Sequence, residues 1–123
     1  MIFGCGTDIE EKDRFNKHYF DKGKLSDLMY DIFTTREIEN FSVFGKEAFL
    51  KGFSFKEAFY KAANWDELGF KDIEIIFDDN THFQIYPSKN LKTWLELNNF
   101  KEIIADFQSS NQYVNFKVIL IQK

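Results

Sequence analysis

Alternating apolar and polar residues predict the strands of this chain. Ile73, Ile75 and Phe77 recur at every second position, which is typical of a strand with one buried face. Residues 78–80 read as a turn, and residues 82–86 are expected to return as the second arm of a hairpin. The same pattern predicts further strands over residues 2–9, 103–107 and 113–121.

Apolar residues at helical spacing predict one long helix over residues 46–64. Thr34 followed by Glu37 forms a capping box that opens another helix, and Ser88 is expected to cap a third. Shorter or weaker helices are expected over residues 10–20 and 25–33. The core face of the long helix should carry Phe49, Phe53, Phe59 and Ala63.

These elements predict an α+β fold, a mostly antiparallel sheet packed against one long helix. A chain of 123 residues without a linker or low-complexity tract is expected to form a single domain over residues 1–123. Hydrophobic residues make up 44% of the chain and 16 residues are Phe, which is ample for a core.

Charge and cysteine content narrow the classes of function. The net charge of −4 disfavours a general nucleic-acid role, because no excess of Lys and Arg is present to replace counterions. The single cysteine, Cys5, excludes an intramolecular disulfide and is expected to be a small buried side chain of the first strand. No membrane span or signal peptide is recognisable, so a cytoplasmic protein without a membrane partner is expected.

Two segments carry candidate chemistry. Asp8 lies in a glycine-punctuated strand, after Gly4 and Gly6, and Glu57 and Lys61 lie four positions apart on the long helix. By themselves these residues also fit a solvated strand end and a weak surface ion pair. The alternative is a magnesium site, because Mg²⁺ is often held by one or two carboxylates plus substrate phosphates.

The order of the motifs resembles the holo-acyl-carrier-protein synthases, the small members of the 4′-phosphopantetheinyl transferase superfamily. Gly4-x-Gly6-Thr7-Asp8-Ile9 with Arg14-Phe15 is similar to their first motif, and Phe53-x-x-Lys56-Glu57-Ala58-x-x-Lys61-Ala62 to their second. Phe33-Thr34-x-x-Glu37, Phe70-x-Asp72-Ile73-Glu74-Ile75 and Tyr113 with Val118-Ile119-Leu120 also fit in order and spacing. The resemblance therefore extends over nearly the whole chain and implies the fold of that superfamily.

The resemblance implies Mg²⁺-dependent transfer of 4′-phosphopantetheine from coenzyme A to a serine of an acyl carrier protein, with 3′,5′-ADP as the leaving group. Asp8 and Glu57 would bind the metal, and Glu57 or a metal-bound water would take the serine proton. Lys56 and Lys61 would contact phosphate oxygens, and Lys61 would assist the departing phosphate. The resemblance further implies a homotrimer with active sites between subunits, and docking of the acidic carrier on Lys12, Arg14 and Lys17.

Two departures from the family pattern remove groups that are expected to bind coenzyme A. Gly52 stands where the family usually has Arg, and Ser109 where it usually has His. Each loss is expected to weaken coenzyme A binding by roughly 10- to 100-fold unless another basic residue compensates, such as Lys46, Lys51 or Lys89. Gly52→Arg and Ser109→His are expected to restore affinity. A non-catalytic carrier-binding or assembly module with the same fold is the alternative function, and an unrelated α+β interaction protein is a third.

Overall fold

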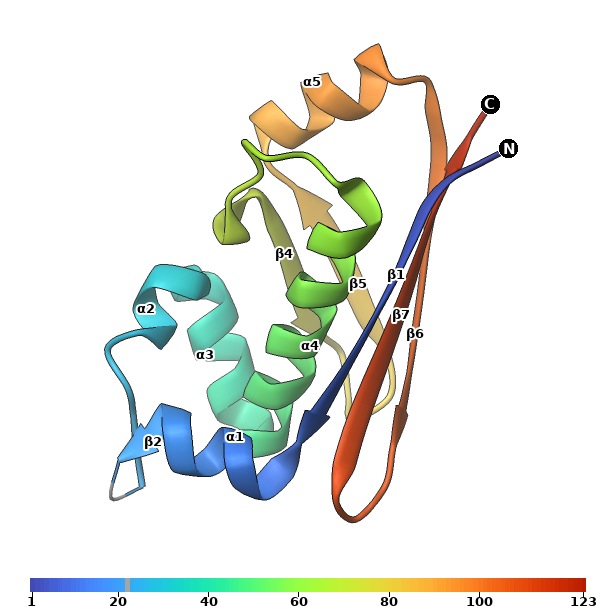
Figure 1. The fold of residues 1–123 in the computed structure, drawn as a ribbon. Helices are drawn as coiled ribbons and strands as arrows, with labels where there is room; N and C mark the ends of the chain where they lie inside the picture. The colour runs from blue at the N-terminus through green and yellow to red at the C-terminus, as the bar shows by residue number, and fades with distance from the viewer. Residues whose placement is uncertain (22) are drawn as a thin grey trace.

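A three-stranded antiparallel sheet lies along one side of the molecule, and one long helix packs against it (Figure 1). The structure is a computed structural model and describes residues 1–21 and 23–123. The sheet has the order β1 (Ile2–Glu11), β7 (Tyr113–Gln122) and β6 (Phe100–Ser109). The helix α4 (Lys46–Ala63) packs along β1 and β7. The predicted α+β architecture, an antiparallel sheet against one long helix, is confirmed.

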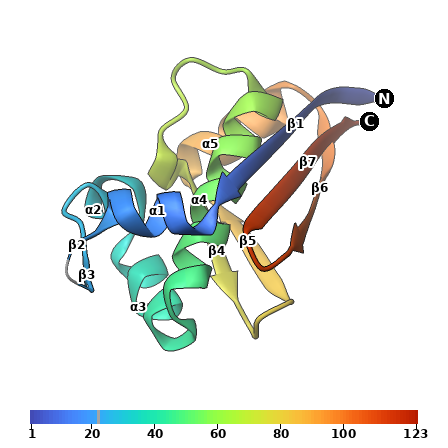
Figure 2. The ribbon, with the colours of Figure 1, turned by 60° about the horizontal axis from the view of Figure 1, so that its bottom comes forward.

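The helices α2 and α3 lie on the side of α4 away from the sheet, and α5 lies at the end of the molecule where both chain termini lie (Figures 1 and 2). The predicted hairpin is confirmed as a separate two-stranded sheet of β4 and β5. The helix expected over residues 25–33 is confined to a single turn, and the strand expected over residues 103–107 extends at both ends. The bounds of these elements are α1 (Lys12–Tyr19), β2 (Phe20–Asp21), β3 (Lys24–Leu25), α2 (Met29–Ile32), α3 (Thr35–Phe44), the 3-10 helix η1 (Phe70–Asp72), β4 (Ile73–Phe77), β5 (Phe83–Pro87) and α5 (Lys89–Leu97).

Local hydrogen bonds explain where two of the helices begin. The Thr34 side chain accepts from the Glu37 N–H at 3.2 Å, and the Glu37 carboxylate accepts from the Thr34 N–H at 3.0 Å. This reciprocal pair is the predicted capping box, and it satisfies two backbone groups at the start of α3. Ser88 likewise accepts from the Leu91 N–H at the start of α5.

The core lies between α4 and the inner face of the sheet and is rich in phenylalanine. Phe55 of α4 meets Phe116 of β7 edge to face, with ring centroids 5.4 Å apart. The four residues predicted to face the core from α4 are all buried, which confirms the helical pattern. Within the described ranges, no helix has both the length and the apolar character needed to cross a membrane.

Close contact between β1 and α4 explains the two glycines of the first strand. A Cβ atom on Gly4 would overlap the carbonyl oxygen of Ala62, and one on Gly6 would overlap that of Ala58. Glycine therefore lets the strand backbone touch the helix backbone. The prediction that Cys5 is buried is wrong, because its side chain lies on the opposite, exposed face of β1.

Candidate functional site

The crossing of β1 and α4 brings Asp8 and Glu57 to one cavity of about 550 Å³. Asp8 follows Gly6 on the inner face of the strand, and Glu57 precedes Ala58, the residue whose carbonyl lies against Gly6. The same close packing that requires glycine therefore positions both carboxylates. The cavity is lined by Asp8, Ile9, Glu10, Glu11, Arg14, Phe15, His18, Tyr19, Phe53, Glu57 and Tyr113.

The two oxygens of Asp8 have different surroundings. Oδ1 lies 3.3 Å from the Lys61 ammonium, which also donates to the Thr7 carbonyl at 3.0 Å. Oδ2 is buried and has no hydrogen-bond partner among the described residues. Lys61 thus reaches from α4 to Asp8 on β1, a pairing that differs from the surface pair with Glu57 suggested by their spacing. A buried carboxylate oxygen without a donor favours a cation beside it.

Excess negative charge also acts on the other carboxylates of the cavity. Burial and then the Asp8 charge raise the pKa of Glu57, while Lys61 lowers it. Burial, then a hydrogen bond to the Asp8 carboxylate and the Asp8 charge, raise the pKa of Glu10 to about 8, so without a cation Glu10 holds a proton at neutral pH that it shares with Asp8. A bound cation would replace that proton. Sequence reasoning missed Glu10. Its place two positions after Asp8, on the same face of a strand, was the signal that would have found it.

The donor set of this cavity fits a hard divalent cation. Carboxylate oxygens are the ligands that Mg²⁺ prefers, and it is usually held by one or two of them together with substrate phosphates and waters. Asp8 and Glu57 match that requirement, and Oδ2 of Asp8, which has no described hydrogen-bond donor, is available as a ligand for such an ion. Across residues 1–21 and 23–123, no three His, Cys, Asp or Glu side chains lie close enough together to hold a metal by themselves.

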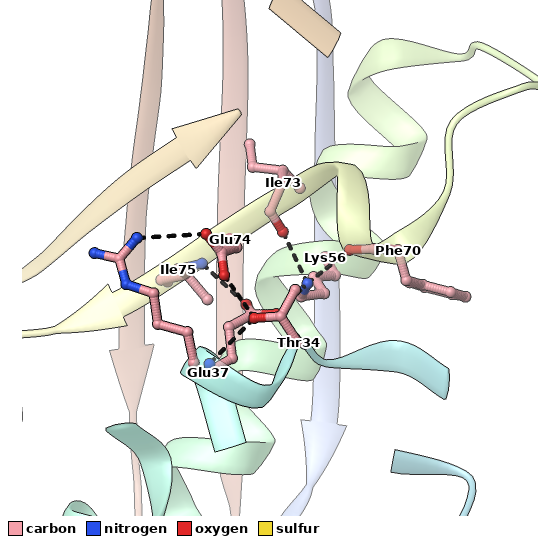
Figure 3. Close-up of polar contacts among 8 residues, drawn as sticks. Thr34, Glu37, Lys56, Phe70, Ile73, Glu74 and Ile75 are labelled. Carbon is pink, nitrogen blue, oxygen red and sulfur yellow. Dashed lines mark hydrogen bonds and ion pairs between the residues drawn. The ribbon is translucent and has the colours of Figure 1, made fainter. Parts of the chain in front are cut away.

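Lys56 does not reach this cavity, which differs from the expected phosphate contact. Its ammonium is buried and donates to Glu37 Oε1 at 2.7 Å and to the carbonyls of Phe70 and Ile73 at 2.6 and 2.8 Å (Figure 3). These three bonds use all of its donors. Glu37 also accepts from the Ile75 N–H, so the buried ion pair joins α3, α4 and β4.

The three residues expected to dock the carrier protein all lie on α1, but in different settings. Arg14 lines the cavity of Asp8 and Glu57, and Lys17 is exposed nearby. Lys12 forms an ion pair with Glu47 of α4 and is only 24% exposed. Arg14 and Lys17 therefore remain open to a partner, whereas Lys12 is already paired within the chain.

The structure shows what surrounds Gly52 and Ser109, the two residues that replace the usual Arg and His. A Cβ atom on Gly52 would lie 2.7 Å from Cζ of Phe41, a fully buried ring. The expectation that Gly52→Arg restores binding is therefore not supported, because the ring fills the space a side chain would need. Ser109 donates to Glu47 at 2.9 Å.

Two of the three lysines suggested as substitutes for the missing basic groups are engaged within the chain, whereas Lys89 is exposed on α5 and does not line the cavity. Lys51 is buried and donates to the Asn80 carbonyl at 2.8 Å. The Lys46 ammonium lies over the Phe20 ring, 5.2 Å from its centroid. Neither of these two side chains faces the cavity of Asp8 and Glu57.

Comparison with known proteins identifies the family. The model of the 4′-phosphopantetheinyl transferase superfamily matches residues 4–114. That span includes both motifs, the cavity and most of the fold, so the chain belongs to the 4′-phosphopantetheinyl transferase superfamily.

Similar proteins are holo-acyl-carrier-protein synthases. The one from Clostridium novyi (strain NT) is 40% identical over 83 residues, which cover 64% of this chain and 58% of that relative. The crystal structure of the Neisseria meningitidis synthase matches with a TM-score of 0.79 and 28% identity, over 99% of this chain and all (100%) of that one. The Bacillus anthracis synthase, solved in complex with CoA (3′,5′-ADP), matches with a TM-score of 0.73 and 25% identity, over 100% of this chain and 99% of that one.

Proposed function

We propose that this protein transfers the 4′-phosphopantetheine arm of coenzyme A to a serine hydroxyl of an acyl carrier protein. The observation that carries the proposal is the cavity between β1 and α4, which both Asp8 and Glu57 line and where the buried Oδ2 of Asp8 has no N–H or hydroxyl donor among the described residues. Membership of the superfamily and the synthase names of the relatives support the same reaction.

In this proposal Asp8 and Glu57 would hold Mg²⁺, with coenzyme A phosphates completing its ligands. When bound, the ion supplies charge neutralisation at the phosphate oxygens as the leaving group departs. Lys61, on the same side of α4 and 3.3 Å from Asp8, adds a mobile positive charge for a phosphate oxygen. Its side chain is about half exposed, at 53%, so it can turn from Asp8 toward a substrate.

The transfer itself requires one proton acceptor. The serine oxygen forms a bond to the phosphorus that bears the pantetheine arm, and the bond from that phosphorus to the bridging oxygen breaks. The electron pair leaves with 3′,5′-ADP, and the serine proton passes to an acceptor in the cavity. In the metal-free site, burial and the Asp8 charge raise the pKa of Glu57. A cation held by both carboxylates would lower that pKa again, so either Glu57 or a water beside it serves as the proton acceptor.

We further propose that the carrier protein docks beside the cavity on Arg14 and Lys17. Both lie on α1, and Arg14 also lines the cavity, so a carrier bound there would present its serine to Glu57. Acidic partners associate faster with a basic surface than with a neutral one. Docking is therefore expected to weaken as salt concentration rises.

We also propose a homotrimer, in which the outer face of the β1-β7-β6 sheet contacts a second copy. That face has no covering layer of its own within the described residues, and Ile9 and Ile104 are 63% and 42% exposed there. It also contains a hollow lined by Ile9, Ser109 and Tyr113 among others. Oδ1 of Asn115, on the same face, is buried without a described partner. A neighbouring copy would cover these groups.

A transfer assay tests the proposed reaction. The protein is incubated with coenzyme A, Mg²⁺ and a panel of apo carrier proteins, and the mass of each carrier is measured. We expect one carrier to gain one phosphopantetheine arm, and the gain to be lost with EDTA and with Glu57→Gln. Glu96→Gln, an exposed glutamate of α5, is the matched control and should behave like the wild type.

A non-catalytic carrier-binding module is the second candidate function. The observation that favours it is the absence, at Gly52 and Ser109, of the basic groups usual in the family, with Lys46 and Lys51 engaged elsewhere. In that case a carrier would bind to α1, but no carrier would gain mass. Binding of coenzyme A in titration calorimetry, tested up to millimolar concentration, separates the two functions.

A further inference from the structure

Tyr19 lies at the cavity of Asp8 and Glu57 but belongs to neither of the motifs that the family shares. It is the last residue of α1 and lines the same cavity as both carboxylates. Asp8, Glu10 and Glu57 line that cavity; ionised carboxylates accept hydrogen bonds but do not donate them, and the proton that Glu10 holds is shared with Asp8. A phosphate entering the cavity therefore needs donors from elsewhere, and Tyr19 carries one.

The ring of Tyr19 is held on two sides by packing. Its centroid lies 4.8 Å from that of Phe15 and 5.4 Å from that of Phe53, one turn before Glu57 on α4. Its carbonyl accepts from the Ser26 N–H at 2.7 Å, which fixes the backbone as well. A ring restrained in this way holds its hydroxyl in place before a substrate arrives, and the hydrogen bond then costs little ordering entropy.

The surroundings of Tyr19 favour the protonated form of its hydroxyl. Burial, and then the charges of Glu10 and Glu57, raise the pKa of this phenol, while Arg14 lowers it. A raised pKa keeps the proton on the oxygen at neutral pH, so the group remains a donor. Among residues 1–20 and 23–123, no side-chain or backbone group forms a hydrogen bond with this hydroxyl.

The other donors that line the cavity differ from Tyr19 in exposure. Arg14, His18 and Tyr113 are all exposed at its rim, whereas Tyr19 is half-buried. A hydrogen bond to a charged oxygen is stronger where water is excluded. Tyr19 is therefore the neutral donor best placed to act on a phosphoryl group within the cavity.

We propose that the Tyr19 hydroxyl donates a hydrogen bond to a non-bridging oxygen of the phosphoryl group that is transferred. The inference rests on the proposed transferase function. Charge on those oxygens changes most in the transition state, so the bond should act mainly on the rate of transfer and less on binding of coenzyme A. Tyr19 would then give the carboxylate-lined cavity a hydrogen-bond donor that carries no charge.

Tyr19→Phe tests the proposal, because it removes the hydroxyl and keeps the ring that packs on Phe15 and Phe53. With Mg²⁺, coenzyme A and the accepted carrier, we expect the single-turnover rate to fall by about 10- to 100-fold. The dissociation constant of coenzyme A, from calorimetry, should change by less than about threefold. Tyr30→Phe, an exposed tyrosine outside the cavity, is the matched control and should leave both values unchanged.

A second measurement does not depend on turnover. In protein labelled with 3-fluorotyrosine, the ¹⁹F signal of Tyr19, assigned by its loss in Tyr19→Phe, should shift when coenzyme A and Mg²⁺ are added. The signal of Tyr30 should stay in place. This readout uses the wild-type chain, so it holds even if the Phe variant is less stable.

The outcomes separate the two proposals. If the wild type transfers the arm but Tyr19→Phe is within twofold of its rate, or the Tyr19 signal does not move, the role of the hydroxyl is refuted and the transferase function stands. If the wild type neither binds coenzyme A nor modifies any carrier, the transferase function fails and the role of Tyr19 fails with it.

Discussion

Asp8 is a buried carboxylate that the protein satisfies at only one of its two oxygens. Oδ1 has Lys61 at 3.3 Å, while Oδ2 has no described donor. Because the partner Lys61 is about half exposed, at 53%, their ion pair should add little to stability. The presence of Asp8 at this position is therefore better explained by cation binding than by a contribution to the stability of the fold.

Asp8→Asn should abolish the Mg²⁺ dependence of coenzyme A binding and leave the fold intact. Asparagine keeps the shape of the side chain but removes the charge that a cation requires. Calorimetric titration with coenzyme A, with and without Mg²⁺, measures the effect. Asp78→Asn, in an exposed turn, is the control. Binding that still strengthens with Mg²⁺ in Asp8→Asn would refute the metal role.

The buried pair of Lys56 and Glu37 gives a prediction about stability. Lys56→Met leaves the Glu37 carboxylate charged and without its cation, which should lower the free energy of unfolding by about 3–5 kcal/mol. The double variant Glu37→Gln with Lys56→Met removes both charges and should be less destabilised than Lys56→Met alone. Urea unfolding measures both. Lys71→Met, an exposed lysine, should stay within about 0.5 kcal/mol of the wild type.

The sequence predicts the contacts of a side chain where its partners lie only a few positions away along the chain. The Thr34–Glu37 box was predictable because its two members lie three positions apart and bond to each other's backbone. The setting of Lys56 was not, because its partners Glu37, Phe70 and Ile73 come from other elements that only folding brings together. A lysine beside a catalytic motif looks the same in sequence whether it points into the core or into the cavity.

At the scale of elements, the contact between β1 and α4 determines the geometry of the site. Gly6→Ala places a methyl group against the Ala58 carbonyl, so the strand must move away from the helix. We expect a loss of about 1–3 kcal/mol in the free energy of unfolding and weaker Mg²⁺-dependent coenzyme A binding, because Asp8 moves with the strand. Cys5→Ala, the neighbour on the exposed face, should change neither property. Unchanged binding in a folded Gly6→Ala protein would show that the spacing of the two elements is not critical.

Helix propensity and core packing predict opposite effects of the substitution Gly52→Ala on stability. Alanine is favoured over glycine in a helix interior by about 1 kcal/mol, so Gly52→Ala would stabilise an isolated helix. In the protein the new methyl group meets the buried Phe41 ring, and overpacking of this kind costs about 1–3 kcal/mol. We therefore expect a lower midpoint of urea unfolding for Gly52→Ala. A higher midpoint would mean that the ring can turn aside and that Gly52→Arg is worth testing.

The faces of the elements were harder to predict than the elements themselves. The alternation in β4 identified its buried face, because apolar residues occupy only one side of that strand. In β1 the buried side carries Gly4, Gly6 and Asp8, while apolar side chains such as Ile9 lie on the exposed side. Hydrophobicity therefore points to the wrong face, and Cys5 was misplaced with it. The glycines are explained only by the helix that packs on them.

At the scale of the whole molecule, the uncovered sheet face predicts how the chain assembles. Ile104 of β6 is 42% exposed and pairs with Ile119 of β7, so an apolar surface runs across adjacent strands on the side away from α4. Contiguous apolar surface of this kind usually marks an interface. In the proposed trimer, a second copy of the chain covers this apolar surface.

Ile104→Lys should dissociate that assembly without unfolding the chain. Its side chain lines neither the cavity of Asp8 and Glu57 nor the core, so a charge there acts at the interface alone. We expect sedimentation to show a trimer for the wild type and a monomer for Ile104→Lys, with weaker coenzyme A binding in the monomer if a neighbouring copy completes the site. Val43→Lys, an apolar residue of α3 that is 78% exposed, is the matched control and should remain trimeric. A wild type that sediments as a monomer at assay concentration would refute the trimer, and it would require one chain alone to bind coenzyme A.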